Sequence, residues 1–568
     1  MREKFRIKQS NIIPGVIFLI TMFIACSPLF TENCINGHDV EYHLLRIESL
    51  KEGILMGKPF LKVNVLFLGG AGYASSMFYP DFLLYVPAIL RVMGVSINAS
   101  YHLFVALCFV LCYGVTYYST KYITKSSYAA AIAAVVLTLC EYHIDDVYTR
   151  SAVGEYTAFI FVPLVICGIY DVIYRNMKNP WILGVGFAGV LLCHTNTLVM
   201  CIGLGVLFFL IKIKTFIRNP KLILKLIITA AATMLATMFY WLPMLEQMSS
   251  TVFHVSTAWI MPDEAMREVS SVFYGTFPAV GICLFLINLP RLMLGKKMTA
   301  ANEQSIDTES DIEKKECLQY ATMLLIVGIG LALAATRIFP WERIGKYISF
   351  IQFPWRLYLM ASVCLAISGA MILHLYFTED KTKEYTLLAV IGIMAVSAFA
   401  NLERTEEGYY SYSNDYFAHE PFTFNIVGGE WLPEAVEEVK LIEESNDAAL
   451  TDDGTEVEFV RDKNSVILTY PQHACDYVDV PLVYYKGYGA YYVTAEGVRE
   501  WLTVTGDGTN GYCRVKMPQD ATADRIIICY RGTTLQTVSY VVSAMALICL
   551  LALMSKSLWQ IRRKKREV

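Results

Sequence analysis

Charged residues are scarce in this chain. They make up 17% of its 568 residues, whereas hydrophobic residues make up 55% and aromatic residues 13%. The mean hydropathy of +0.45 is too high for an ordinary soluble protein of this size. The composition therefore predicts a polytopic membrane protein.

Cysteine pairs of the kind that bind zinc are also missing. The 15 cysteines include no CxxC pair and no zinc-type spacing, and most of them lie in apolar runs, where cysteine behaves as a small hydrophobic residue. Three fall in a later polar region, at Cys475, Cys513 and Cys529. An odd count argues against a disulfide framework and leaves room for one bridge.

Apolar runs long enough to form transmembrane helices are abundant, since a span takes about 20 residues. The basic segment Met1–Lys8 before the first run also fits a signal peptide, but no small-residue cleavage site follows, and we interpret the run as a retained span. We predict about twelve spans, near residues 12–30, 100–120, 127–141, 157–174, 181–195, 197–213, 222–242, 271–290, 320–337, 355–376, 385–400 and 536–555.

Lysine and arginine recur in every second connection between these runs. By the positive-inside rule this pattern places both termini in the cytoplasm, with the basic tail Arg562–Arg566 among the inner segments and residues 301–318 as a polar inner loop. The run PDFLLYVPAIL, residues 80–90, would reverse the pattern if it crossed the membrane. We therefore predict a juxtamembrane helix there, on the outer side.

Residues 401–535 differ in composition from the rest of the chain. They hold 24 Asp and Glu against 10 Lys and Arg, and they contain alternating or β-branched runs such as SVILTY and RIIICY, separated by glycine-rich turns. We predict three parts: a transmembrane domain over residues 1–400 with a first outer loop at 31–99, an extracytoplasmic β-rich domain over 401–535, and a final span with a basic tail over 536–568.

The first outer loop contains a cluster of ionisable residues in the stretch GHDVEYHLLR. Asp39, His43 and Arg46 are spaced i, i+4 and i+7, so on a helix they would share one face, with Glu41 and Glu48 on a solvated side. A carboxylate can act as a base or hold a cation, and His or Arg can bind a phosphate. The alternative is a plain surface helix with an Asp–His pair.

The second outer loop, EYHIDDVYTRSAVGEY, adds Arg150 and Glu155. Glu155 is unusual because it begins an apolar span, where ionisable groups tend to be paired or functional, and Arg150 is the expected partner. Asp145 and Asp146 fit an ordinary polar loop equally well.

Three further residues have structural alternatives. Arg356 begins a span, where it either snorkels or holds a lipid phosphate. His194 lies between two spans and is better explained by helix packing than by ligand binding. Asp81 follows Tyr79-Pro80 and is better explained as a helix cap.

Several of these stretches resemble one enzyme family. HDVEYHLLRIESL, with Asp39-Val40-Glu41, is similar to the first-loop acidic motif of the GT-C glycosyltransferases, and MFYPDFLLYVPAIL is similar to their YPPL segment, with Asp81 in place of the second proline. TRSAVGEYTAFIFVPL, IQFPWRLYLMAS, VPLVYYKGYGAYY and CYRGTTLQTVSYVVS resemble a bacterial group labelled 6-pyruvoyl-tetrahydropterin synthase-related membrane proteins and the YfhO-type proteins. The motif WWDYG of the oligosaccharyltransferases is absent, which argues against N-linked transfer to protein.

The resemblance implies a polytopic GT-C-like fold and transfer of a sugar from a polyprenyl phosphate to a cell-envelope glycan, teichoic acid or lipid. It implies that Asp39 orients or deprotonates the acceptor hydroxyl, that Arg150 or Arg356 neutralises the departing phosphate, and that Glu155 positions Arg150 or the sugar. The remaining implied site residues are Glu41 as a second acid and His43 and Arg46 as phosphate ligands; Glu41 with His43 would also suit a divalent cation.

Two other classes of function compete with a transferase. One is a lipid or glycan flippase or exporter, and the other is a membrane scaffold without activity. Transporters usually place polar sites near the midplane at broken helices, whereas the charges here cluster at one face. Nothing in the chain suggests a nucleic-acid partner.

Overall fold

The computed structural model describes residues 2–564 except residues 65, 258–308, 349–350, 405–407, 420–425, 427–428, 438–447, 463–464, 472 and 519–523. The chain forms two compact units. The first comprises residues 1–40, 101–233 and 259–411, and the second comprises residues 41–100, 234–258 and 412–568.

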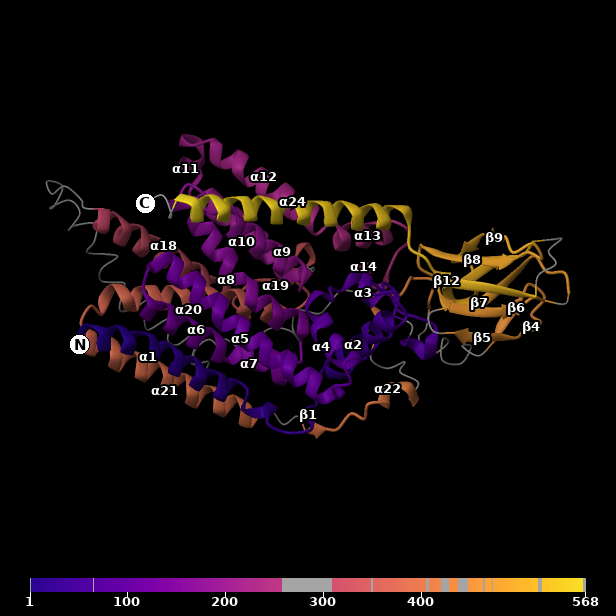
Figure 1. Ribbon diagram of the computed structural model, residues 1–568, viewed down its shortest axis with the longest axis horizontal. Coiled ribbons are helices and arrows are strands. Elements are labelled where there is room, and N and C mark those ends of the chain that lie inside the picture. The colour runs from indigo at the N-terminus through magenta and orange to yellow at the C-terminus, as the bar shows by residue number, and fades with distance from the viewer. Residues whose placement is uncertain are drawn as a thin grey trace. The chain divides into compact units, whose positions relative to one another are not determined.

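The first unit is helical (Figure 1). Among the described residues its helices are α1 (Arg2–Ala25), most of α5 (Ile97–Thr124), α6 (Ser127–Leu139), α7 (Glu141–Tyr148), α8 (Val153–Tyr174), α9 (Pro180–Leu191), α10 (Thr195–Ile211), α11 (Ile213–Arg218), most of α12 (Lys221–Ala236), α18 (Glu309–Ala334), α19 (Trp341–Ile344), α20 (Leu357–Tyr376) and α21 (Asp380–Arg404).

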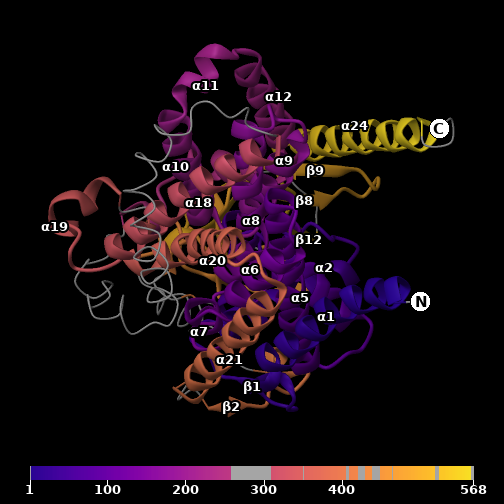
Figure 2. The same ribbon diagram turned by 90° about the vertical axis from the view of Figure 1, so that its left-hand side faces the viewer.

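Helix α20 lies at the centre of this unit. It packs against α18, α6, α8 and α7, and Figure 2 shows it beside α6 and α18. Almost all of its side chains are buried. Helix α6, with the sequence SYAAAIAAVVLTL, contacts α20, α21 and α1 through its small residues. Small side chains allow helix backbones to approach closely, which is how helices gain packing energy in lipid.

Six described helices are long and apolar enough to cross a membrane: α5, α8, α18, α20 with the turn before it, α21 and α24 (Thr534–Lys564). Two bent pairs, α6 with α7 and α12 with α13 (Met238–Met248), raise the number to eight, and they break by 43° and 76°. The protein is thus a helical membrane protein, and twelve spans stay a prediction. The predicted span at 271–290 lies outside the described residues.

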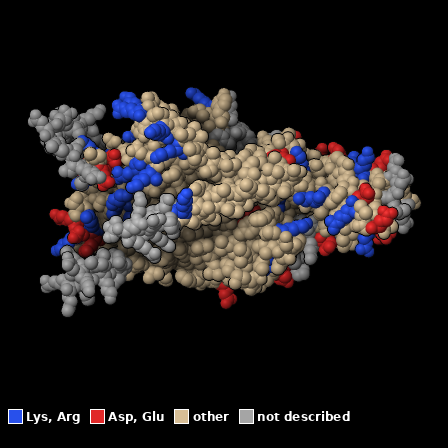
Figure 3. Space-filling model, turned by 45° about the horizontal axis from the view of Figure 1, so that its top comes forward, with Lys and Arg blue, Asp and Glu red and all other residues tan. Residues whose placement is uncertain are grey.

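Basic side chains gather at one end of the first unit. Lys214, Arg218, Lys221 and Lys225, on α11 and α12, are exposed, and Figure 3 shows Lys and Arg concentrated around this end while the neighbouring helical surface carries little charge. This is the arrangement that a positive-inside connection requires.

The second unit combines short helices, the long helix α24 and a β-sandwich. Its helices also include most of α2 (Val40–Leu55), α3 (Ser75–Phe78), α4 (Tyr85–Val92), α13, α14 (His254–Thr257) and α22 (Tyr416–His419). Its strands are β3 (Ala449–Thr451), β4 (Glu456–Val457), β5 (Phe459–Asp462), β6 (Ser465–Thr469), β7 (Tyr477–Val483), β8 (Tyr488–Val493), β9 (Arg499–Leu502), β10 (Val504–Thr505), β11 (Tyr512–Lys516) and β12 (Arg525–Tyr530).

These strands form two antiparallel sheets, in the orders β10-β11-β7-β3-β4 and β5-β6-β12-β8-β9. Alternate residues of both sheets, such as Val478 and Val480 of β7 and Ile526 and Ile528 of β12, form one aliphatic core. The β-rich region expected before the last apolar helix is therefore present. Cys475, Cys513 and Cys529 are all free, so the bridge that the sequence left room for does not form.

A short loop after α1 is fastened to the helical unit. Strand β1 (Cys34–Ile35) pairs with β2 (Tyr409–Tyr410), and the backbone N–H groups of His38 and Asp39 donate to the carbonyls of Thr149 and Arg150, each at 3.0 Å. Gly37 allows this approach: a Cβ atom there would lie 2.3 Å from Ser151 Oγ and 2.9 Å from the Tyr148 carbonyl oxygen.

We predict that Gly37→Ala destabilises the protein by about 1–3 kcal/mol, because the added methyl group overpacks this contact. Gly15→Ala is the control, since no atom lies within 4 Å of the site of its Cβ on α1. Thermal unfolding in detergent should show a lower Tm for Gly37→Ala and an unchanged or higher Tm for Gly15→Ala. Equal Tm values for the two variants would mean that the loop is not held in this way.

Candidate functional site

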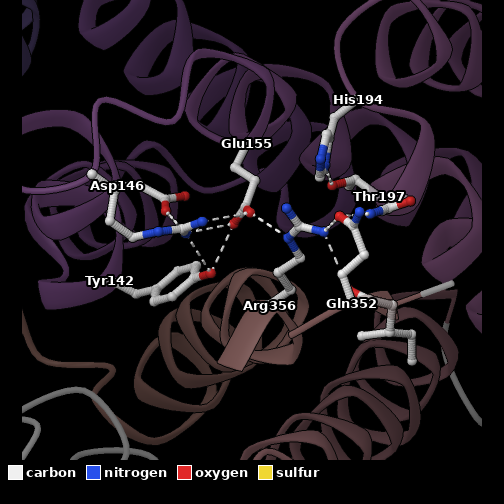
Figure 4. Close-up of polar contacts among 10 residues, drawn as sticks. Tyr142, Asp146, Glu155, His194, Thr197, Gln352 and Arg356 are labelled. Carbon is white, nitrogen blue, oxygen red and sulfur yellow. Dashed lines mark hydrogen bonds and ion pairs between the residues drawn. The ribbon is translucent and has the colours of Figure 1, made fainter. Parts of the chain in front are cut away.

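Glu155 is the centre of a buried polar cluster in the helical unit (Figure 4). It occupies the first turn of α8, where the positive end of the helix dipole favours a carboxylate. Only 2% of its side chain is exposed, so it needs partners to stay ionised among apolar helices.

Two arginines provide that partnership. Arg150 donates from Nη1 to Glu155 Oε2 and from Nη2 to Oε1, both at 3.0 Å, in a two-pronged pair. Arg356 donates from Nε to Oε1 at 2.6 Å. The hydroxyl of Tyr142 donates to Oε2 at 2.8 Å. The prediction that Glu155 pairs with Arg150 is confirmed, and Arg356 neither snorkels nor stands alone but shares the same carboxylate.

Each arginine also contacts protein groups other than Glu155. Arg150 pairs with Asp146 on α7, and Arg356 donates to the side chain of Gln352 and, at 3.2 Å, to the carbonyl of Ile351. Gln352 adopts φ +63°, a backbone conformation that costs free energy and is concentrated at functional sites. Its side-chain oxygen also accepts from Asn196 Nδ2 at 3.1 Å.

His194 borders this cluster beside Arg356 (Figure 4). Its Nδ1 forms a hydrogen bond of 2.8 Å with Thr197 Oγ1, and the residue directly precedes α10. The expected helix-packing role fits this contact.

The exposed fractions within the cluster are uneven. The side chains of Arg150 and Arg356 are 14% and 11% exposed, whereas those of Glu155 and Asp146 are 2% and 0% exposed. The accessible surface that remains in this cluster therefore belongs mainly to the two arginine side chains. Such a surface suits a bound anion.

Asp39 belongs to the same unit and lies close to this cluster. Besides its backbone bond to Arg150, its carboxylate interacts electrostatically with Arg150, Glu155 and Arg356. Burial raises the pKa of Asp39 above its usual value, and the positive charge of Arg150 partly opposes that rise.

The prediction that Asp39, His43 and Arg46 share one helical face is wrong. Helix α2 begins at Val40, so Asp39 precedes it. His43 and Arg46 are buried in the second unit, where Arg46 Nη1 lies 3.1 Å from His43 Nδ1 and Arg46 Nη2 pairs with Asp81. Burial, followed by the nearby Arg46, holds the pKa of His43 well below its usual value, so the imidazole is neutral.

The acidic residues of this segment also differ from expectation. Glu48 is not on a solvated side: it is buried and accepts from Arg91 Nη2 at 3.2 Å and from Lys51 at 3.0 Å. Glu41 accepts from the hydroxyl of Tyr416 at 3.1 Å. Asp81 does not cap a helix through its side chain and pairs with Arg46 instead.

Two buried polar residues, one in each unit, were not singled out from the sequence. Tyr142 stands eight residues before Arg150, a spacing that offered a weak helical signal. Lys62 is buried near Asp81, and its burial lowers its pKa to about 8, against the opposing effect of Asp81. Within the parts of the chain that the structure describes, no three His, Cys, Asp or Glu side chains are grouped as metal ligands.

Comparisons with known proteins show distant similarities. No family model matches the chain. An uncharacterized protein of Lactococcus lactis is 21% identical over 567 residues, covering 90% of both chains. Among solved structures, the oligosaccharyltransferase AglB of Archaeoglobus fulgidus, in complex with an inhibitory peptide and a dolichol-phosphate, matches at TM-score 0.39 and 12% identity. ArnT of Cupriavidus metallidurans bound to undecaprenyl phosphate matches at TM-score 0.32 and 12% identity.

The coverage of these structures is partial. The AglB match includes 70% of this chain and 56% of the AglB chain, and the ArnT match includes 77% of this chain and 72% of the ArnT chain. The chain thus spans little more than half of the archaeal protein.

We predict that Glu155→Gln leaves two buried guanidinium groups without their shared carboxylate and destabilises the protein by roughly 3–5 kcal/mol. Thermal unfolding in detergent measures this loss. Added inorganic phosphate should raise the Tm of Glu155→Gln more than that of the wild type, because the anion replaces the missing charge. Glu32→Gln, at an exposed position, is the control and should change neither value. An unchanged Tm for Glu155→Gln would contradict the central role of this carboxylate.

Proposed function

We propose that the protein is a membrane glycosyltransferase that moves a sugar from a polyprenyl phosphate to a cell-envelope acceptor. The observation that carries this proposal is the Glu155 carboxylate, which holds Arg150 and Arg356 side by side at the start of an apolar helix. Two guanidinium groups fixed in this way suit the phosphate of a lipid-linked donor.

In this proposal the arginines stabilise the negative charge that develops on the departing phosphate. Because Glu155, Asp146 and Gln352 already fix the guanidinium positions, little reorganisation accompanies the reaction. Glu155 is then a positioning residue that acts through the two arginines.

Asp39 is the proposed base for the acceptor hydroxyl. Its backbone N–H binds the carbonyl of Arg150, which supports a position beside the proposed donor phosphate, and its raised pKa makes it a better proton acceptor than an ordinary aspartate. At a pH above its pKa the carboxylate is ionised and ready to accept the proton. Activity should therefore fall as the pH drops through that raised pKa.

This proposal gives a structural role to three residues that the sequence suggested for the site: His43 and Arg46, as phosphate ligands, and Glu41, as a second acid. His43 is neutral, and Arg46 binds Asp81 and the carbonyls of Tyr79 and Pro80, so in this proposal the pair holds the segment after α3 and does not contact the donor. The proposal retains a GT-C-like arrangement of about twelve spans, both termini in the cytoplasm and the β-rich domain outside. It leaves a divalent cation open.

The break between α6 and α7 favours one other function, a lipid flippase. Broken helices mark the substrate sites of many transporters, and Asp146 lies on the second half of this pair. Scrambling of a fluorescent polyprenyl phosphate across vesicles, without release of sugar, would support that alternative.

We predict that Asp39→Asn in nanodiscs loses about 10²–10⁴-fold in turnover, as expected for removal of a general base. The measurement offers a panel of polyprenyl-phosphate sugars and cell-envelope acceptors and follows release of polyprenyl phosphate at several pH values. In the wild type, turnover should fall on the acidic side at a pH above the usual aspartate pKa.

Glu32→Gln, in the same loop and exposed, serves as the matched control and should keep wild-type turnover. Equal turnover by Asp39→Asn and Glu32→Gln would remove Asp39 from the mechanism. Arg356→Gln should lose turnover as well, and Arg356→Lys should regain only part of it, because lysine lacks the planar pair of donors.

A further inference from the structure

The outward face of the sheet β5-β6-β12-β8-β9 carries a row of apolar side chains that crosses every strand. Ile526 and Ile528 fill the sandwich core, so Ile527 between them points outward. The residues in register with it continue the row. The row consists of Val460, Ile467, Ile527, Tyr491 and Trp501.

Two aromatic rings and two arginines form one end of this row. Trp501 is 44% exposed, and its ring centroid lies 4.9 Å from that of Tyr491. The guanidinium carbon of Arg531 lies 3.5 Å from the Trp501 ring centroid, and that of Arg499 lies 5.0 Å from the Tyr491 ring centroid. Gly489 leaves the space for this stack, since a Cβ there would lie 3.0 Å from Arg531 Cδ.

Positive charge on this face contrasts with the acidic region around it. The outward positions of β12, β8 and β9, with the residue after β12, include Arg525, Arg499 and Arg531 and no acid, and the acid at an outward position of the sheet is Asp462, at the far end of β5. Residues 401–535 as a whole hold 24 acidic and 10 basic residues.

The arginines lie on both sides of this apolar row, toward the two ends of the strands. The Cα atoms of Arg525, at the start of β12, and Arg531, directly after its end, are six residues apart, which corresponds to about 20 Å along the strand. That distance exceeds the length of one phosphate or carboxylate group and its sugar, and it fits an extended chain with several such groups.

Membrane anchoring explains part of this pattern. Arg531 precedes α24 by three residues, and Trp with Arg is common where a span meets the headgroups. Anchoring does not explain why arginines recur at the opposite end of β12, at Arg525 and, two strands away, at Arg499.

We propose that this face binds an anionic glycan, an extended chain of sugar rings that bear phosphate or carboxylate groups. Sugar rings stack on Trp501 and Tyr491, and Arg499, Arg525 and Arg531 bind the anionic groups. The face would hold the acceptor chain if the proposed transfer takes place, and binding can be measured without any turnover.

The experiment measures binding of oligogalacturonate, a chain of carboxylate-bearing sugars, to the full-length protein in nanodiscs of neutral lipid by isothermal titration calorimetry. Trp501→Ala should weaken binding at least about 10-fold. Arg499→Gln with Arg531→Gln should weaken it similarly and flatten its dependence on salt. Val460→Ala, at the other end of the row and 65% exposed, is the matched control and should bind as the wild type does.

Two further ligands separate the contribution of sugar stacking from that of charge. Neutral maltoheptaose should bind more weakly than oligogalacturonate, and Trp501→Ala should weaken the binding of inorganic polyphosphate less than that of oligogalacturonate, because polyphosphate loses the ordering of Arg531 but no sugar stacking. Trp501→Tyr should restore most of the binding, which separates lost stacking from a misfolded strand. Failure of the wild type to bind oligogalacturonate, or equal binding by Trp501→Ala, would overturn the proposal. Quenching of Trp501 fluorescence by brominated lipids that persists with bound oligogalacturonate would identify the face as a membrane anchor instead.

Discussion

The carboxylate of Glu155 is the constraint on which the helical unit depends. An ionised carboxylate and two guanidinium groups are costly to bury unless each is paired, and in lipid the cost of an unpaired charge is higher still. Glu155 meets this constraint with hydrogen bonds from Arg150, Arg356 and Tyr142. These partners come from α7, the loop after it and the turn before α20, so one carboxylate fixes elements that are about 200 residues apart.

The position of the first loop follows from the same constraint. Arg150 uses its side chain for Glu155 and its backbone carbonyl for Asp39, so the loop after α1 is placed by the residue that the buried carboxylate holds. Gly37 makes the approach sterically feasible. The proposed base and the two arginines proposed to bind the phosphate are therefore positioned by a single chain of contacts, which is the preorganisation that charge stabilisation in a transition state requires.

Local patterns in the sequence predicted the features that depend on neighbouring residues. Long apolar runs identified α5, α8, α20 and α24, and β-branched alternation identified a β-rich region, because both signals are set by the immediate chain. The arrangement of its strands in two sheets was not predicted. The pairing of Glu155 with Arg150 was also accessible, since only five residues separate them. The bond from Arg356 was not, because its partner lies 201 residues away and no local rule selects it. Asp39 was assigned to α2 because spacing alone cannot show that its backbone N–H bonds to Arg150 rather than entering the helix.

The arginines around Glu155 and those on the β-sandwich are ordered in the same way, by contact with aromatic rings. A free arginine side chain loses rotamer entropy when it binds an anion, and that loss weakens binding. Around Glu155, the guanidinium of Arg356 lies 5.0 Å from the Phe353 ring and that of Arg150 lies 5.8 Å from the Trp355 ring. On the sandwich, Arg531 lies against Trp501 in the same manner. In both places contacts with aromatic rings order the arginine side chain before any anion binds, while part of that side chain stays accessible. Binding of an anion therefore loses less side-chain entropy.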